Sequence, residues 1–231
     1  MLNGTILNAT GSTLEINSGK YQDDVNYVPT GGLTTYAISS SGVCNIVNAD
    51  IEGVTSNNGG IMNIYDGNFG IEIKGSLSNS NNGTMNIYNA SIGNEKRGSI
   101  NNTANLNIYN CKYCYQITAN NGTTHLYGGK IGTIQYNNVI IEGGTVEYIY
   151  QPKTADIKGG TLTGRNNVAL RLWQGTANIS GGIFEANAFD GAGTWNVTGG
   201  KFKLKPSTAR ISEGYKCVGP DENGYYEVVK E

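Results

Sequence analysis

The best candidate group for catalysis among the charged side chains lies in the second half of the chain. It comprises Glu142, Glu147, Asp156, Lys158 and Arg165. Two carboxylates facing one site could cleave a glycosidic bond as an acid and base pair. However, Glu142 and Lys158 occupy the same outward position in successive copies of the repeat described below, which predicts a surface ion pair. We therefore expect no catalytic residues and a protein that is not an enzyme.

The cysteines suggest a second kind of chemistry. Cys111 and Cys114 form a C-x-x-C motif, but a zinc site needs a second pair or nearby histidines. Cys44 and Cys217 are distant in sequence, and His125 is the only histidine. Cys111 also falls at a position of the repeat that is always small, so the pattern favours a small buried residue. We expect no metal ion and no cofactor.

Composition excludes several partners. The net charge is −2, from 16 basic and 18 acidic residues, which gives no electrostatic footprint for nucleic acid. No apolar run approaches the ~20 residues of a membrane-spanning helix. No signal-peptide pattern is visible either, so we expect an export signal, if there is one, outside this sequence.

An internal repeat dominates the chain. Its clearest copies are Asn-Ile-Ser-Gly-Gly-Ile-Phe at 178–184 and Asn-Val-Thr-Gly-Gly-Lys-Phe at 196–202. The central apolar residue recurs roughly every 20 residues, the length of one solenoid repeat. These central positions are Met1, Ile16, Ile46, Ile64, Ile87, Ile108, Leu126, Ile141, Ile157, Ile179 and Val197.

Each copy alternates apolar and polar residues around its centre, which is typical of a strand with one buried face. A small residue follows three positions after the centre, and an apolar residue follows five positions after it, including Ile6 and Tyr113. A unit this short cannot hold a strand–helix–strand. We predict an all-β, single-stranded, right-handed parallel β-solenoid of about eleven coils. The long step from Ile16 to Ile46 fits either one coil with a loop or two short coils.

The repeat stops after Phe202. Gly-Tyr-Lys-Cys-Val at 214–218 and Tyr-Tyr-Glu-Val-Val at 225–229 flank Gly-Pro-Asp-Glu-Asn-Gly at 219–224, which predicts a β-hairpin. A solenoid end exposes its core and must be covered. We therefore divide the chain into a β-helix at 1–203 and a C-terminal cap at 204–231.

The glycine-rich copies resemble the coils of the right-handed parallel β-helix superfamily, which includes pectate lyases, adhesins and phage tailspikes. The resemblance covers residues 1 to about 203 and implies the fold. Lyases of that superfamily cluster their carboxylates and a basic residue on neighbouring coils, whereas the acids here are scattered. The tail, with Gly-Gly-Lys-Phe at 199–202 and Glu-Asn-Gly-Tyr-Tyr at 222–226, is similar to the end of repeat regions in secreted or cell-surface proteins of gut bacteria.

Two outward columns are candidate ligand-binding residues. One position after the centre stand Tyr65, Tyr88, Tyr109 and Tyr127, and one position before it stand Asn45, Asn63, Asn86 and Asn107. Stacked aromatic rings beside amides could bind sugars through ring faces and hydrogen bonds. The alternative is that both columns only stabilise the stack.

Together these features predict a non-enzymatic surface module of an exported bacterial protein, secreted or on the cell surface, as an adhesin-like or spacer segment. A carbohydrate-binding or polysaccharide-cleaving β-helix domain is the alternative, and a phage tail-fibre component is a second one. We expect a monomer whose partners are glycans or a host surface.

Overall fold

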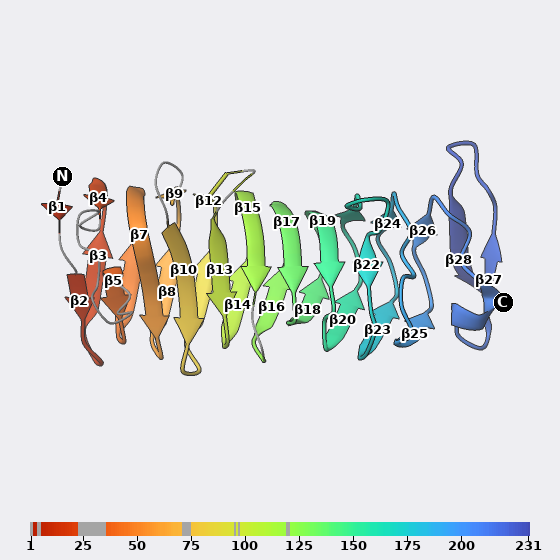
Figure 1. Cartoon of the computed structure of the whole chain (residues 1–231), viewed down its shortest axis with the longest axis horizontal. Helices are drawn as coiled ribbons and strands as arrows, with labels where there is room; N and C mark the ends of the chain where they lie inside the picture. The colour runs from red at the N-terminus through yellow and green to blue at the C-terminus, as the bar shows by residue number, and fades with distance from the viewer. Residues whose placement is uncertain are drawn as a thin grey trace.

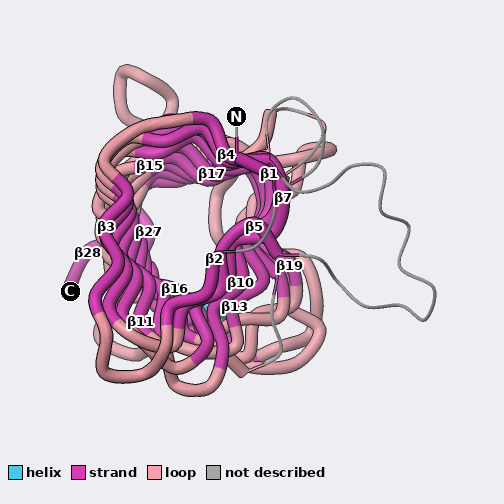
Figure 2. Tube along the Cα trace, turned by 90° about the vertical axis from the view of Figure 1, so that its left-hand side faces the viewer, coloured by secondary structure: helices cyan, strands magenta, loops and turns pink. Residues whose placement is uncertain are grey.

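The protein is an elongated stack of parallel β-coils in a computed structural model (Figure 1), which describes residues 2–3, 6–22, 36–70, 75–94, 96, 98–118 and 121–231. The strands follow one another along the long axis from β1 to β28, and the described residues contain no α-helix. Seen end-on, strands of successive coils overlie one another around the axis (Figure 2). The all-β solenoid predicted from the repeat is confirmed, with about nine turns in place of about eleven coils.

The first wall of the rod is a ten-stranded parallel sheet, to which each coil contributes one four-residue strand. In spatial order its strands are β25 (Thr194–Val197), β23 (Thr176–Ile179), β20 (Thr154–Ile157), β18 (Asn138–Ile141), β16 (Thr123–Leu126), β14 (Asn105–Ile108), β11 (Thr84–Ile87), β8 (Ile61–Ile64), β6 (Val43–Ile46) and β3 (Thr13–Ile16). Every described central position pairs with the central position of the next coil, and all ten side chains are buried.

The remaining parallel strands form a second and a third wall, and β7, β15, β17 and β19 bend from one wall into the other. The second wall holds β1 (Leu2–Asn3), β4 (Lys20–Gln22), β9 (Gly67–Phe69), β12 (Ala90–Ile92), β21 (Thr161–Leu162), β24 (Ile183–Phe184), β26 (Lys201–Phe202) and the first parts of β7 (Ala49–Asn58), β15 (Cys111–Thr118), β17 (Lys130–Gln135) and β19 (Thr145–Tyr150). The third wall holds β2 (Ile6–Asn8), β5 (Tyr36–Ser40), β10 (Gly75–Ser80), β13 (Ser99–Asn102), β22 (Leu170–Arg171) and the last parts of β7, β15, β17 and β19. The repeat pattern anticipated the second wall but did not separate the third.

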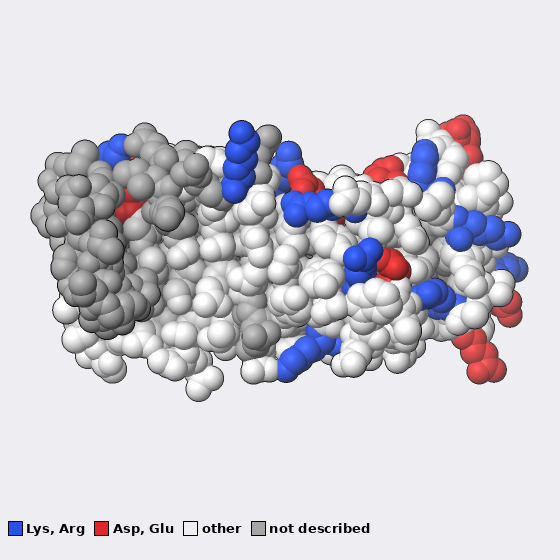
Figure 3. Space-filling model, viewed as in Figure 1, with Lys and Arg blue, Asp and Glu red and all other residues white. Residues whose placement is uncertain are grey.

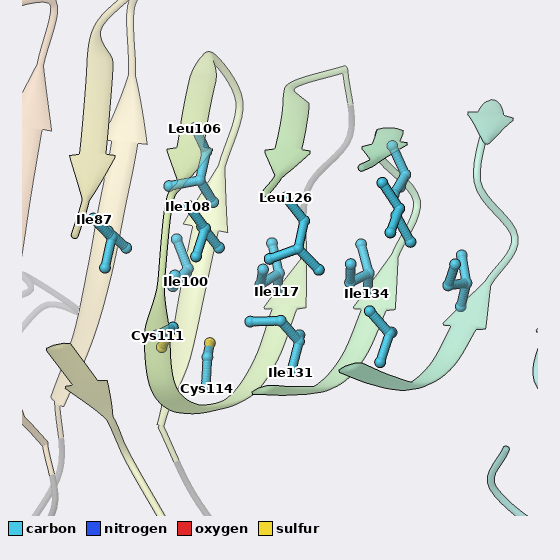
Figure 4. Close-up of a cluster of buried hydrophobic side chains, with 14 of the residues drawn as sticks. Ile87, Ile100, Leu106, Ile108, Cys111, Cys114, Ile117, Leu126, Ile131 and Ile134 are labelled. Atoms are coloured by element: carbon cyan, nitrogen blue, oxygen red, sulfur yellow. The ribbon is translucent and has the colours of Figure 1, made fainter. Parts of the chain in front are cut away.

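Isoleucine dominates the core that the three walls enclose. Figure 4 shows this for the middle coils, where Ile108 from the first wall, Ile131 from the second and Ile117 from the third all lie in the interior. Burying each such side chain contributes about 1.5–3 kcal/mol. Because the same column position is filled in coil after coil, stability accumulates along the rod from contacts between neighbours.

The small residue three positions after each centre is required by the corner between the first and second walls. Gly129 has a φ of +93°, and a Cβ added there would lie 2.2 Å from the backbone nitrogen of Cys111 in the preceding coil. Only glycine combines a positive φ with so close an approach of two backbones.

The long step from Ile16 to Ile46 is a single coil. Thr13–Ile16 pairs directly with Val43–Ile46, with no strand between them. The two first-wall strands are therefore one coil apart, and residues 23–35 of the step between them lie outside the described residues.

Two positions of the repeat were assigned wrongly. Tyr113 does not point into the core five positions after its centre, because a bulge in β15 pairs Cys114 with Ile92 and leaves Tyr113 half-buried. Ile6 pairs with Ile38, so it lies in the third wall and not the second. The centre assigned to that first copy, Met1, lies outside the described residues.

The predicted C-terminal hairpin is present. Strands β27 (Tyr215–Val218) and β28 (Tyr226–Lys230) pair antiparallel, and β28 pairs antiparallel with β26. A short 3₁₀ helix, η1 (Thr208–Arg210), precedes them. Val228 of β28 is buried with the core, so the hairpin covers the last coil. The boundary between residues 203 and 204 stays a prediction.

Among the residues that the structure describes, none belongs to a helix long and apolar enough to span a membrane.

Candidate functional site

The four tyrosines predicted to form an outward column do so. Consecutive ring centroids of Tyr65, Tyr88, Tyr109 and Tyr127 are 4.9, 4.9 and 5.0 Å apart, and the planes of consecutive rings differ by only 6–10°. The tyrosines follow the central residues of β8, β11, β14 and β16, so the ladder register of the first wall sets their spacing. The strand pairing of the first wall therefore fixes the spacing of the tyrosine rings.

The stacking changes what the column can offer a ligand. Each ring covers a face of its neighbour, so the inner rings present mainly edges and hydroxyl groups to solvent. Burial raises the pKa of the Tyr88 hydroxyl, and the neighbouring Tyr109 and Tyr65 raise it further. The ring faces that the sequence suggested for sugar binding are thus used in contacts between coils.

The asparagines of the outward column form hydrogen bonds with one another along the axis of the rod. The Nδ2 of Asn63 donates to Oδ1 of Asn45 over 2.9 Å, Asn86 donates to Asn63 over 2.8 Å, and Asn107 donates to Asn86 over 2.9 Å. Each inner amide thereby gives one donor and one acceptor to its own ladder. The structure brings all eight predicted residues onto one face, and their binding of a glycan stays a prediction.

The tyrosine column ends against a charged group. The Tyr127 hydroxyl lies 3.0 Å from Nδ1 of His125, and the two rings stack with centroids 4.0 Å apart. Nζ of Lys158 donates to Oε1 of Glu142 over 2.8 Å, which confirms the predicted ion pair. This hydrogen bond lowers the pKa of the Glu142 carboxyl below its ordinary value, and His125 lowers it further.

The other members of the charged group have partners of their own. Arg165 pairs with Glu147 at 3.3 Å, and Asp156 accepts from Asn178 at 2.6 Å. Figure 3 shows one face of the rod, on which uncharged residues predominate and some basic residues lie next to an acidic one. Within the described ranges, no three His, Cys, Asp or Glu residues are placed to share a metal ion.

The C-x-x-C motif lies inside the rod (Figure 4). Cys111 and Cys114 are buried and free, and Sγ of Cys111 contacts the carbonyl oxygen of Ala90 at 3.2 Å. Burial raises the pKa of the Cys111 thiol to about 12 and that of Cys44 to about 11. Cys111 is therefore a small core residue, as the repeat predicted.

A second asparagine ladder, which sequence reasoning missed, runs inside the rod. Asn57, Asn79 and Asn102 are fully buried at the ends of β7, β10 and β13. Asn57 donates to Asn79 over 2.8 Å and Asn79 donates to Asn102 over 2.9 Å. Each also donates to a backbone carbonyl of the next coil, at 2.7–3.0 Å. The signal was a recurring asparagine just before a turn, at an offset from the centre that varies between coils.

A further missed feature is an open recess of about 440 Å³ beside Trp173. It lies where two successive coils turn from the third wall into the first. Trp173 has no counterpart in other copies of the repeat, so periodicity could not reveal it.

Comparison with protein-family models, with curated proteins and with solved structures found no match to this chain.

Proposed function

We propose that this chain is a non-enzymatic, rod-like module of an exported bacterial protein, which acts at the cell surface as a spacer or an adhesin-like segment. The observation that carries the proposal is the unbroken register of ten strands in the first wall. A stack in which every coil binds the next along a parallel sheet is stiff, and its length is set by its number of coils.

The outward side chains support the spacer role. The residues that resemble a recognition surface, the tyrosines and asparagines, bond to one another along the axis. Cross-strand aromatic and amide ladders of this kind stabilise sheets by themselves. Their repetition is thus accounted for without a ligand.

The surface location rests on the resemblance of the C-terminal tail to secreted and cell-surface proteins. The buried cysteines are compatible with it, because their thiols are shielded from an oxidising medium. A carbohydrate-binding role is the second candidate, and the exposed Trp173 beside its recess is the observation that favours it.

The spacer role can be tested by shortening the rod in register. Deleting residues 65–108 joins Ile64 directly to Tyr109, which removes two coils and keeps the order of all wall positions. At ~4.8 Å per coil the rod should lose about 10 Å. The chain would be anchored on a bacterial surface through one end, and energy transfer between a dye at the other end and a membrane dye would report its height.

The expected result is a lower height for the deletion variant and an unchanged height for Tyr88→Ala/Tyr109→Ala. Equal heights for the parent and the deletion variant would contradict the spacer role. Release of sugar fragments from any polysaccharide by the purified chain would contradict the non-enzymatic assignment.

A further inference from the structure

The recess beside Trp173 lies between two successive coils and is lined by residues of both. One coil supplies the segment after β19 and the next supplies the segment before β23. The lining residues are Gln151, Pro152, Lys153, Trp173, Gln174 and Gly175. None of them belongs to the tyrosine or asparagine columns, so this is a separate surface of the rod.

Trp173 is exposed although its side chain is large and mostly apolar. Its exposed fraction is 53%, and no ring stacking or cation contact occupies it among the described residues. The other tryptophan, Trp195, packs against Phe189 at 5.2 Å and lies under the Arg210 guanidinium at 4.8 Å. An aromatic side chain that is about half exposed beside a recess is the kind of surface that binding sites use.

Two amides complete the polar side of the recess. The side chains of Gln151 and Gln174 have no hydrogen-bond partner among the described residues. Each amide has two donors and an acceptor oxygen with two lone pairs. The charged lining residue, Lys153, donates to Oδ1 of Asn121 and forms no ion pair with a carboxylate in the described ranges.

The backbone around the recess is held in place before any ligand arrives. Gln151 N donates to the carbonyl of Arg171 over 2.8 Å, and Thr176 N donates to the carbonyl of Lys153 over 3.0 Å. Gly175 has a φ of +98°, and a Cβ there would lie 2.4 Å from the carbonyl oxygen of Lys153. The two coils are therefore locked together at the recess, which makes it a preformed site.

We propose that this recess binds a neutral pyranose ring of a saccharide. The apolar C–H face of such a ring packs on an aromatic face. Trp173 is 53% exposed and no ring stacks on it among the described residues, whereas the inner tyrosine rings stack on each other. Sugar hydroxyls both donate and accept, which matches the unpaired amides of Gln151 and Gln174. The recess is within the ~300–1,000 Å³ of small-molecule sites.

This inference goes beyond the spacer role, which depends on rod length and needs no ligand. The two-coil deletion of residues 65–108 does not touch the recess. If no sugar binds, the spacer role is still tested by the height measurement. If the deletion leaves the height unchanged, the recess is still tested by the binding measurement.

The test uses the whole purified chain and neutral hexasaccharides of glucose, mannose, xylose and galactose, measured by calorimetry. In a Trp195→Phe background, Trp173 is the sole tryptophan, and its fluorescence reports binding at the recess. Trp173→Ala and Gln151→Ala/Gln174→Ala are the loss variants. Tyr88→Ala/Tyr109→Ala is the matched control on the other aromatic surface, and circular dichroism checks that each variant folds.

At least one hexasaccharide should bind and shift the Trp173 fluorescence. Trp173→Ala should weaken binding at least about tenfold and the double glutamine variant about three- to tenfold, as expected for losing a ring contact and one or two hydrogen bonds. The tyrosine control should bind like the parent. The proposal is overturned if no hexasaccharide binds at about 5 mM, or if folded Trp173→Ala binds as tightly as the parent.

Discussion

The internal asparagine ladder offers the sharpest test of how the rod is held together. Asn79 is fully buried and makes three hydrogen bonds: it accepts from Asn57 at 2.8 Å and donates to Asn102 at 2.9 Å and to the carbonyl of Asn105 at 2.7 Å. Asn79→Ala removes all three. At about 1 kcal/mol for each bond, and more where a buried partner is left unpaired, the free energy of unfolding should fall by about 3–5 kcal/mol.

Asn86→Ala is the matched control in the outer ladder. Asn86 also donates to one asparagine and accepts from another, at 2.8 and 2.9 Å, but it is only half-buried. Water can replace both lost bonds, so the cost should be about 1 kcal/mol. Both variants lie in the middle coils, which removes end fraying as an explanation for a difference.

The assay is urea unfolding followed by circular dichroism, with the slope checked for each variant. The expected result is a much lower midpoint for Asn79→Ala than for Asn86→Ala at an unchanged slope. Equal shifts would refute the reasoning, because they would mean that burial of the inner ladder does not set its contribution.

Further outcomes follow from the same structure. Ile108→Ala should cost about 2–5 kcal/mol, because it opens a cavity in the central column, whereas Ile6→Ala should cost less because Ile6 is only half-buried and lies near an end of the stack; melting temperatures measure both. In the folded protein, a thiol reagent should modify the half-buried Cys217 well before the three buried cysteines, as counted by mass spectrometry. Burial raises the pKa of Cys111 from 9.0 to about 12, so its contribution to stability should be complete below pH 9 and be lost as the pH rises toward 12. Urea midpoints across that range should fall less steeply for Cys111→Ala than for the parent.

Period-two alternation around a regularly recurring centre was enough to predict the first wall. A shift of one residue would turn every buried side chain outward, so the pattern fixes register strongly there. The third wall escaped prediction because the connections that lead into it vary in length from coil to coil. Counting five residues from the centre wrongly predicted that Tyr113 points into the core. A single bulge in β15 shifts the register, so that Cys114 takes the buried position instead. Tyrosine occurs in both buried and exposed positions, so the residue type at 113 did not indicate the bulge.

The candidate site was predictable only as far as it repeats. The tyrosine and asparagine columns were found because a parallel stack aligns equal positions. The ring stacking and the amide hydrogen bonds within these columns depend on side-chain orientations, which a sequence does not specify. A tryptophan at the position of Trp173 does not recur in the other coils. Its exposure depends on the local path of the chain between the third and first walls.

The claim that the surface columns serve the stack is tested most directly by Tyr88→Ala/Tyr109→Ala, measured for both melting and binding on a glycan array. The variant loses all three stacked contacts of the column. At ~0.5–1.5 kcal/mol for each, stability should fall by about 2–4 kcal/mol. We predict this loss together with unchanged glycan binding. A variant that melts like the parent but loses a glycan the parent binds would show that the column is a recognition surface.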